Sequence, residues 1–350
     1  MKDLTFVITG LTMGGAELSL LRLVSWLSNH QNANINIVSL TPASTTIRNA
    51  LKNKCRLIEI HSRFKVFSFL IGLYYLLRIK PKILHGHMVH ANILCMVYKA
   101  VSPSTNTVIT AHSTEEGFLC FAYSYLSRFV DVSTHISRVG LRSYIERGYF
   151  KDNKSVYIPN GLELLAVGVD KKPCGRIKRF ICVGRLAKVK RFDLVIRSFA
   201  QSRLQYSDIQ LTIVGEGPER RKLQALSCDL DVNDCVHFSG YKEDVNSLYT
   251  ESDCLIIFSE YEGLPNVLLE AMRIGMPVIT NNVGDCGLIA GETSGVCLVT
   301  ENNIIGLKNE ILRSCELGSS EIHLMSRENQ EYFNAHFSME VTIKKLNKLY

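Results

Sequence analysis

Short apolar runs alternate with an amphipathic stretch along the first half of the chain. Residues 4–9, 35–40 and 107–111 have the composition of buried strands, whereas residues 16–27 have the apolar spacing of an amphipathic helix. Strands that alternate with helices in this way are typical of a doubly wound parallel sheet. The first half is therefore predicted to form a doubly wound α/β domain.

The alternation restarts after a weakly patterned stretch, residues 164–176, which is the candidate linker. Beyond it, strands are predicted at residues 179–183 and 254–258, and a helix is predicted at residues 192–201. A chain of 350 residues is too long for one typical core and fits two domains. With a boundary near residue 170, the expected parts are two domains at residues 1–170 and 171–330 and a C-terminal helical segment at residues 331–350.

The most informative stretch is residues 259–277, which follows the apolar run at residues 254–258. A Gly-Leu-Pro turn leads into a predicted helix at residues 265–274; the turn carries Glu262 and the helix carries Glu270. The first amides of a helix and its dipole can hold a phosphate, so the two carboxylates could bind hydroxyls on either side of that phosphate. Alternatively, both acids simply favour a helix N-terminus electrostatically.

Residues 259–277 resemble the Glu-x7-Glu signature of family 4 glycosyltransferases, in the form Ser-x-x-Glu-Gly-x-Pro-x-x-x-x-Glu-Ala-x-x-x-Gly-x-Pro. Glu262 and Glu270 fall on the two acids of this signature. Three shorter segments are similar to the same family: Gly-Gly-Ala-Glu at residues 14–17, Gly-Arg-Leu-x-x-x-Lys at residues 184–190 and Val-Gly-x-Gly-Pro at residues 214–218. The resemblance covers most of the chain and is most specific between residues 184 and 277.

The resemblance implies the GT-B fold, in which two Rossmann-like doubly wound domains face each other across a cleft. The N-terminal domain would bind the acceptor and the C-terminal domain the nucleotide sugar, with the last helix crossing back to the N-terminal domain. The implied reaction is a retaining, metal-independent transfer of a hexose or N-acetylhexosamine, most often from a UDP-sugar, without a cofactor. The implied acceptor is a saccharide or a lipid-linked saccharide of bacterial surface polysaccharide, such as capsule, O-antigen or lipopolysaccharide.

The resemblance also assigns site residues. Arg185 and Lys190 would neutralise the leaving diphosphate, Glu262 would orient the sugar and stabilise positive charge at its anomeric carbon, and His112 would contact the sugar. Glu270 would hold the ribose of the nucleotide. The remaining donor-binding residues are Gly14, Gly15, Gly184, Gly215, Gly263, Leu264, Pro265, Asn266 and Val267.

The charge and the cysteines limit the partners and the compartment. A formal net charge of +7 favours anionic partners without identifying them. The eleven cysteines include no Cys-x-x-Cys, which argues against a zinc site and a disulfide scaffold. Strand residues begin at residue 4, so no signal peptide is expected and the protein should be cytoplasmic.

Residues 66–77 form a largely apolar run that is too short to span a bilayer. Basic residues flank it: Arg63, Lys65, Arg78, Lys80 and Lys82. A helix of this kind could lie in the interface of an anionic membrane, or it could be a buried core helix. Because the family often uses lipid-linked acceptors, the resemblance favours peripheral membrane contact through residues 63–82.

Other classes of site fit the residues less well. The turn at residues 10–15 lacks the glycine spacing of a dinucleotide fingerprint and the Lys-Ser/Thr of a Walker motif. The histidines at 85, 87 and 90 have no carboxylate or cysteine beside them, and Asp229-Leu-Asp231 lies in a predicted turn, so no metal is expected. A nucleotide-sugar 2-epimerase remains an alternative, as does a non-catalytic module that binds an anionic surface. The ordered motifs argue against nucleic acid as a partner.

Overall fold

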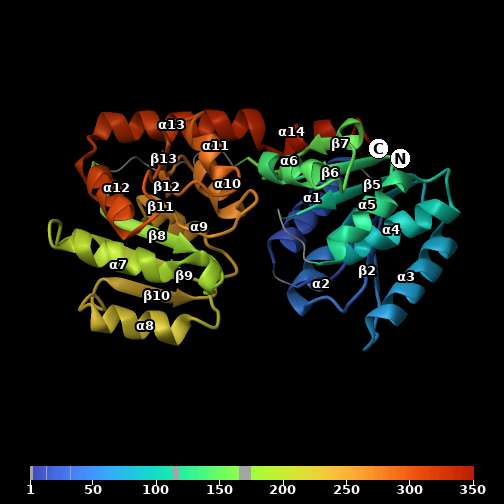
Figure 1. The fold of residues 1–350 in the computed structure, drawn as a ribbon, viewed down its shortest axis with the longest axis horizontal. Coiled ribbons are helices and arrows are strands. Elements are labelled where there is room, and N and C mark those ends of the chain that lie inside the picture. The colour runs from blue at the N-terminus through green and yellow to red at the C-terminus, as the bar shows by residue number, and fades with distance from the viewer. Residues whose placement is uncertain (1–2, 13, 32, 113–117, 165–174) are drawn as a thin grey trace. The chain divides into compact units, whose positions relative to one another are not determined.

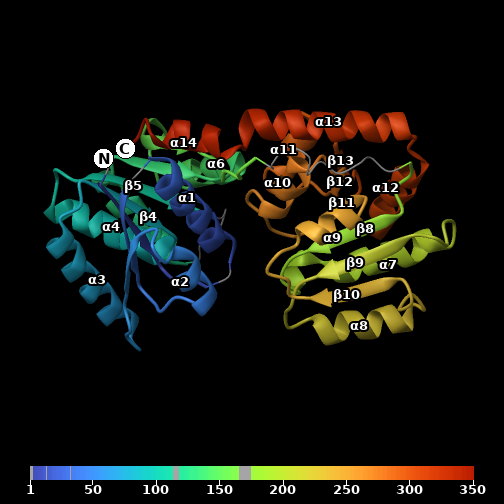
Figure 2. The same cartoon turned by 180° about the vertical axis from the view of Figure 1, so that it is seen from behind.

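The computed structural model describes residues 3–12, 14–31, 33–112, 118–164 and 175–350. The chain divides into two units, one formed by Met1–Glu163 with Met339–Tyr350 and the other by Leu164–Ser338. The boundary predicted near residue 170 lies outside the described residues. Each unit is built on a parallel sheet with helices packed on its faces (Figures 1 and 2).

The described residues of the first unit form a seven-stranded sheet in the order β3-β2-β1-β4-β5-β6-β7, with all pairings parallel. The strands are β1 (Asp3–Ile8), β2 (Asn34–Ser39), β3 (Arg56–Glu59), β4 (Ile83–His87), β5 (Asn106–Ala111), β6 (Val132–His135) and β7 (Ser155–Tyr157). The α-helices are α1 (Gly15–Gln31), α2 (Thr45–Leu51), α3 (Lys65–Ile79), α4 (Val89–Val101), α5 (Phe121–Leu126), α6 (Arg138–Glu146) and α14 (Met339–Leu346). Three 3-10 turns complete the unit, η1 (Phe118–Cys120), η2 (Ser127–Phe129) and η3 (Asp152–Lys154).

Strand β1 is largely apolar on both faces because each face of the sheet supports a separate core. Phe6 and Ile8 of β1 pack in one core with side chains from α1, α2 and α14, whereas Val7 packs in the other with side chains from α3, α4 and α5. Strands covered on both faces are typical of parallel sheets. This double coverage explains why strand residues appear in the sequence as continuous apolar runs.

The described residues of the second unit repeat the plan with a six-stranded parallel sheet, in the order β10-β9-β8-β11-β12-β13. Its strands are β8 (Arg179–Val183), β9 (Gln210–Val214), β10 (Val236–Gly240), β11 (Cys254–Ile257), β12 (Val278–Thr280) and β13 (Val296–Leu298). Its helices are η4 (Lys188–Lys190), α7 (Phe192–Arg203), α8 (Arg220–Asp229), α9 (Asn246–Glu251), α10 (Asn266–Arg273), α11 (Cys286–Ala290), α12 (Ile304–Glu316) and α13 (Ser319–His336). The predicted doubly wound α/β architecture is thus confirmed in both halves.

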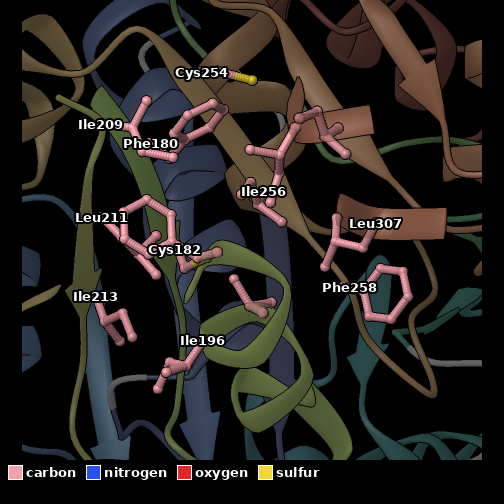
Figure 3. Close-up of a cluster of buried hydrophobic side chains, with 14 of the residues drawn as sticks. Phe180, Cys182, Ile196, Ile209, Leu211, Ile213, Cys254, Ile256, Phe258 and Leu307 are labelled. Carbon is pink, nitrogen blue, oxygen red and sulfur yellow. The ribbon is translucent and has the colours of Figure 1, made fainter. Parts of the chain in front are cut away.

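One apolar cluster of the second unit supports one face of its sheet (Figure 3). Phe180 and Cys182 of β8 point into it together with Ile256 of β11 and Ile196 of α7. These side chains are at most 2% exposed. Burial of each large apolar side chain contributes about 1.5–3 kcal/mol to the free energy of unfolding. The cluster therefore fixes β8 and β11, whose carboxyl ends carry the candidate site, side by side.

The C-terminal segment differs from the prediction of one helical segment at residues 331–350. Residues 331–336 end α13, which belongs to the second unit, and α14 begins at Met339 in the first unit. The break follows from tertiary contacts, because the Phe337 side chain is fully buried and the Met339 amide donates to the Leu162 carbonyl at 2.8 Å. No glycine or proline marks this break in the sequence.

Candidate functional site

The candidate site of the second unit is built from the loops that follow β8 and β11. These strands are neighbours and run parallel, so both loops leave the same edge of the sheet. The two loops are joined directly, since the Glu260 amide donates to the Val189 carbonyl at 2.7 Å. In a doubly wound sheet the strand order reverses at this position, which is where such folds bind ligands.

Lys190 and Glu262 meet across this junction. The Lys190 Nζ donates to the Glu262 Oε1 at 2.5 Å, and the two side chains are only 24% and 12% exposed. The Coulomb attraction within this pair is less screened by water than in a fully exposed pair. Two of the predicted catalytic residues, 72 residues apart in the sequence, are therefore in contact.

The loop after β8 is held by the loop after β9. The Leu186 amide donates to the Glu216 carbonyl at 2.9 Å, and the Glu219 amide donates to the Leu186 carbonyl at 3.0 Å. A Cβ at Gly217 would overlap the Leu186 carbonyl, and one at Gly215 would overlap the Gly184 carbonyl. Glycine is therefore required at both positions for the two loops to approach this closely.

The exposed Arg185 lies on the same loop and forms no ion pair with the described residues. Helix α10 begins directly after the β11 loop, with Pro265 as its N-cap. Its first turn contains no acidic residue, and Pro265 supplies no capping side chain. The helix dipole is therefore not compensated there by a side chain of that turn. Gly263, Leu264, Asn266 and Val267 occupy the same turn and the start of the helix, as predicted from the sequence.

Glu270 lies further along α10 in a different environment from that of Glu262. The buried Tyr249 of α9 donates its hydroxyl to the Glu270 Oε2 at 3.1 Å. One carboxylate is thus paired with a cation and the other with a neutral donor. The Glu270 and Tyr249 pairing was not anticipated from the sequence, because nothing in the local pattern of residues 245–251 links them.

A third loop, after β12, supports the Glu262 turn through backbone contacts. Gly284 has a φ of +51°, and the Asp285 amide donates to the Gly263 carbonyl at 2.8 Å. A Cβ at Gly284 would overlap the Gly263 carbonyl and would lie 2.6 Å from the Glu262 carbonyl oxygen. Local sequence patterns do not reveal this backbone support of the Glu262 turn, which only the structure shows.

The predicted sugar-binding His112 belongs to the first unit, as do Gly14 and Gly15 at the start of α1. The His112 Nε2 and the His87 Nδ1 lie 2.8 Å apart and share a hydrogen bond. Burial lowers the pKa of His112 to about 4 and holds the pKa of His87 well below its usual range. Both rings are therefore neutral near pH 7, so they act as hydrogen-bonding groups and not as cations.

The neighbouring His85 shares short hydrogen bonds with Tyr350 and with Thr110, both at 2.6 Å. A small cavity of about 40 Å³ opens beside His85, His87 and His112, between α1 and α14. The histidines at 85, 87 and 90 do not form a metal cluster: in the part of the chain that the structure describes, no three His, Cys, Asp or Glu side chains are placed to share an ion. The other candidate metal motif, Asp229-Leu-Asp231, is divided between a helix and a turn. Asp229 is the last residue of α8, and Asp231 has a positive φ in the turn that follows.

A family model described as glycosyl transferases group 1 matches residues 174–329. An uncharacterized glycosyltransferase of Haemophilus influenzae is 29% identical over 202 residues, which cover 56% of this chain and 55% of the relative. A relative from Escherichia coli, named UDP-Gal:alpha-D-GlcNAc-diphosphoundecaprenol alpha-1,3-galactosyltransferase, is 26% identical over 321 residues, which cover 85% of this chain and 81% of the relative. For the first relatives, the matched region spans about half of their length.

The solved structure of the Anabaena protein HepE in complex with UDP and glucose has a TM-score of 0.82 with this chain. The two sequences are 16% identical, and the superposition covers 99% of each chain. At this identity the likeness concerns the fold alone. The fold is the predicted GT-B architecture of two Rossmann-like domains.

Proposed function

We propose that this chain, whose residues 174–329 match the family model described as glycosyl transferases group 1, transfers a sugar from a nucleotide diphosphate sugar to a saccharide or lipid-linked acceptor. The observation that carries the proposal is the contact between Lys190 and Glu262 beside the N-terminus of α10. A cation, a carboxylate and a helix end lie together at the carboxyl edge of a parallel sheet, where a charged leaving group could be held.

Electrostatic stabilisation of the leaving diphosphate is the central step of this proposal. Negative charge develops on the phosphate oxygen as its bond to the anomeric carbon breaks. Lys190, the exposed Arg185 and the first amides of α10 supply positive charge on the same side of the sheet. These groups need no metal ion to balance a diphosphate, and we propose that the reaction proceeds without one.

We propose that Glu262 orients the sugar and stabilises positive charge at its anomeric carbon, with retention of configuration. Before the donor binds, Lys190 holds the Glu262 carboxylate in place at 2.5 Å. A bound diphosphate offers Lys190 a second anionic partner, so that one ammonium bridges the leaving group and the carboxylate. His112, as a neutral ring, would contribute a hydrogen bond to a sugar hydroxyl.

The acceptor is proposed to be a lipid-linked saccharide of bacterial surface polysaccharide. The name of the Escherichia coli relative includes a diphosphoundecaprenol-linked sugar as its acceptor and UDP-galactose as its donor. That relative matches 85% of this chain, including most of the first unit, and thus supports a similar class of acceptor and a UDP-sugar donor.

Donor binding tests the nucleotide part of this proposal. Glu270→Gln should raise the Kd for UDP about tenfold or more, because a hydrogen bond from a ribose hydroxyl to a charged group contributes about 1.5–3 kcal/mol. Glutamine keeps an oxygen for the Tyr249 hydroxyl, so the fold should be unaffected. Calorimetric titration with UDP gives the Kd of each variant.

The matched control is Glu260→Gln, which removes an exposed carboxylate from the neighbouring loop. Its Kd for UDP should equal that of the unmodified protein. Equal UDP affinity in the Glu270→Gln variant and in the unmodified protein would exclude Glu270 from the nucleotide site.

A further inference from the structure

The outward face of α3 is apolar, which is unusual for a surface helix. The side chains of Val66 and Tyr74 are 70% and 57% exposed, and Phe64, the N-cap residue, is 62% exposed. We call this surface the α3 face; its other members are Phe67, Leu70, Ile71 and Leu77. Helices at the surface of soluble proteins usually carry polar residues on that side.

The inward face of α3 carries two small residues among its apolar side chains. Ser68 and Gly72 are buried there, one turn apart, followed by Leu76. A Cβ at Gly72 would lie 2.8 Å from the Leu94 Cδ2 and 3.1 Å from the Leu40 Cδ2. Small residues therefore let α3 pack tightly against α4 and β2, and the side chains of the α3 face point away from the core.

Basic residues frame the α3 face at both ends. Arg63 and Lys65 lie at its start, and Arg78, Lys80 and Lys82 lie at its end, all with exposed side chains. The sequence contains no acidic residue between Glu59 and Glu115. Figures 1 and 2 show α3 on the outside of α4, at an edge of the first unit. The combination is an exposed apolar strip with positive charge at each end.

We propose that α3 lies in the surface of an anionic lipid bilayer, with its apolar face buried among the lipids and its basic ends at the headgroups. A helix of 15 residues is about 22 Å long, and interfacial helices of this kind bury their apolar face about 5–10 Å deep. Among the described residues, no helix is both long enough and apolar enough to span a bilayer. The proposal is therefore for a helix that lies on the membrane.

A second copy of the chain fits this surface less well than a bilayer. Two-fold pairing of α3 in antiparallel orientation would place Arg63 and Lys65 of one copy beside Arg78, Lys80 and Lys82 of the other. Like charges in contact destabilise such a pair. Anionic lipid headgroups complement the same charges, and each basic residue near an anionic surface adds to binding.

Sedimentation with lipid vesicles tests this proposal without any nucleotide sugar. Its outcome is therefore independent of whether the proposed transfer reaction occurs. The full chain should bind vesicles of phosphatidylcholine mixed with phosphatidylglycerol, and it should bind phosphatidylcholine vesicles about tenfold or more weakly. The variant Phe67→Ser/Leu70→Ser should lose about tenfold or more of its binding to the anionic vesicles. The variant Arg78→Glu/Lys80→Glu should lose at least as much, and its remaining binding should respond less to salt than that of the unmodified chain.

Ile305→Ser/Leu324→Ser is the matched control, since both side chains are exposed apolar residues of the second unit. It should bind vesicles as the unmodified chain does, and all variants should keep the unmodified Tm and UDP affinity. Equal loss of binding in this control, or equal binding of the unmodified chain to both kinds of vesicle, would overturn the proposal. So would a dimer in solution that Phe67→Ser/Leu70→Ser dissociates, because a second copy would then cover the α3 face.

Discussion

Replacing Lys190 with alanine is expected to lower kcat about 10²-fold to 10³-fold. Removal of one positioned electrostatic contact to a developing negative charge costs about 2.7–4 kcal/mol in other enzymes. Here the same ammonium also holds Glu262 at 2.5 Å, so its loss removes charge from the leaving group and releases the carboxylate. The measurement is the rate of nucleoside diphosphate release at saturating donor and acceptor.

Lys188→Ala is the control for this prediction, because Lys188 is an exposed cation of the same 3-10 turn. Its kcat should stay within about twofold of the unmodified enzyme, as expected for a solvated surface charge. Circular dichroism should show the same fold for both variants. A Lys190→Ala enzyme with the turnover of the Lys188→Ala enzyme would refute the role of Lys190 at the leaving group.

Gly284→Ala is expected to lower both stability and turnover. The backbone at Gly284 has a φ of +51°, and an added Cβ would overlap the Gly263 carbonyl and approach the Glu262 carbonyl oxygen to 2.6 Å. Backbone atoms cannot rotate away as a flexible side chain can, so the Glu262 turn must move. We expect a cost of about 1–3 kcal/mol from overpacking in addition to the backbone strain, and at least a tenfold loss of kcat from misplacement of Glu262.

Gly148→Ala separates the two contributions to this effect. Gly148 has a φ of +68°, but an added Cβ would meet nothing within 4 Å. This control should therefore show only the cost of a left-handed residue, about 1–2 kcal/mol, with unchanged kcat. Thermal unfolding gives the Tm of both variants. A Gly284→Ala enzyme that matches Gly148→Ala in Tm and in kcat would contradict the proposed support of Glu262 by the β12 loop.

The sequence predicted the architecture because both faces of each sheet are covered. The resulting strands are continuous apolar runs, and the helix predicted at residues 265–274 corresponds to α10 (Asn266–Arg273). The motif that carries Lys190 and the motif that carries Glu262 were each recognised in the sequence from their residue patterns, without any indication that the two side chains are in contact. Their contact follows from the doubly wound strand order, which makes β8 and β11 neighbours.

Features that depend on tertiary packing could not be predicted from local patterns. The break between α13 and α14 results from the burial of Phe337. The β12 loop supports the Glu262 turn through a hydrogen bond between backbone atoms, and the side-chain sequence gives no sign of such a contact. The orientation of α3 was also open, since residues 66–77 are apolar on every side. The structure places Ser68 and Gly72 inward, and it exposes the side chains of the α3 face.

Nucleoside diphosphate release from a panel of nucleotide sugars tests the central claim most directly. The assay contains chelator and compares reactions with and without a membrane lipid extract. We predict release from at least one UDP-sugar, an increase with the lipid extract, and loss of that release in the Lys190→Ala enzyme. Absence of release from every donor in the presence of the extract, or an epimerised sugar formed from donor alone, would contradict a glycosyltransferase.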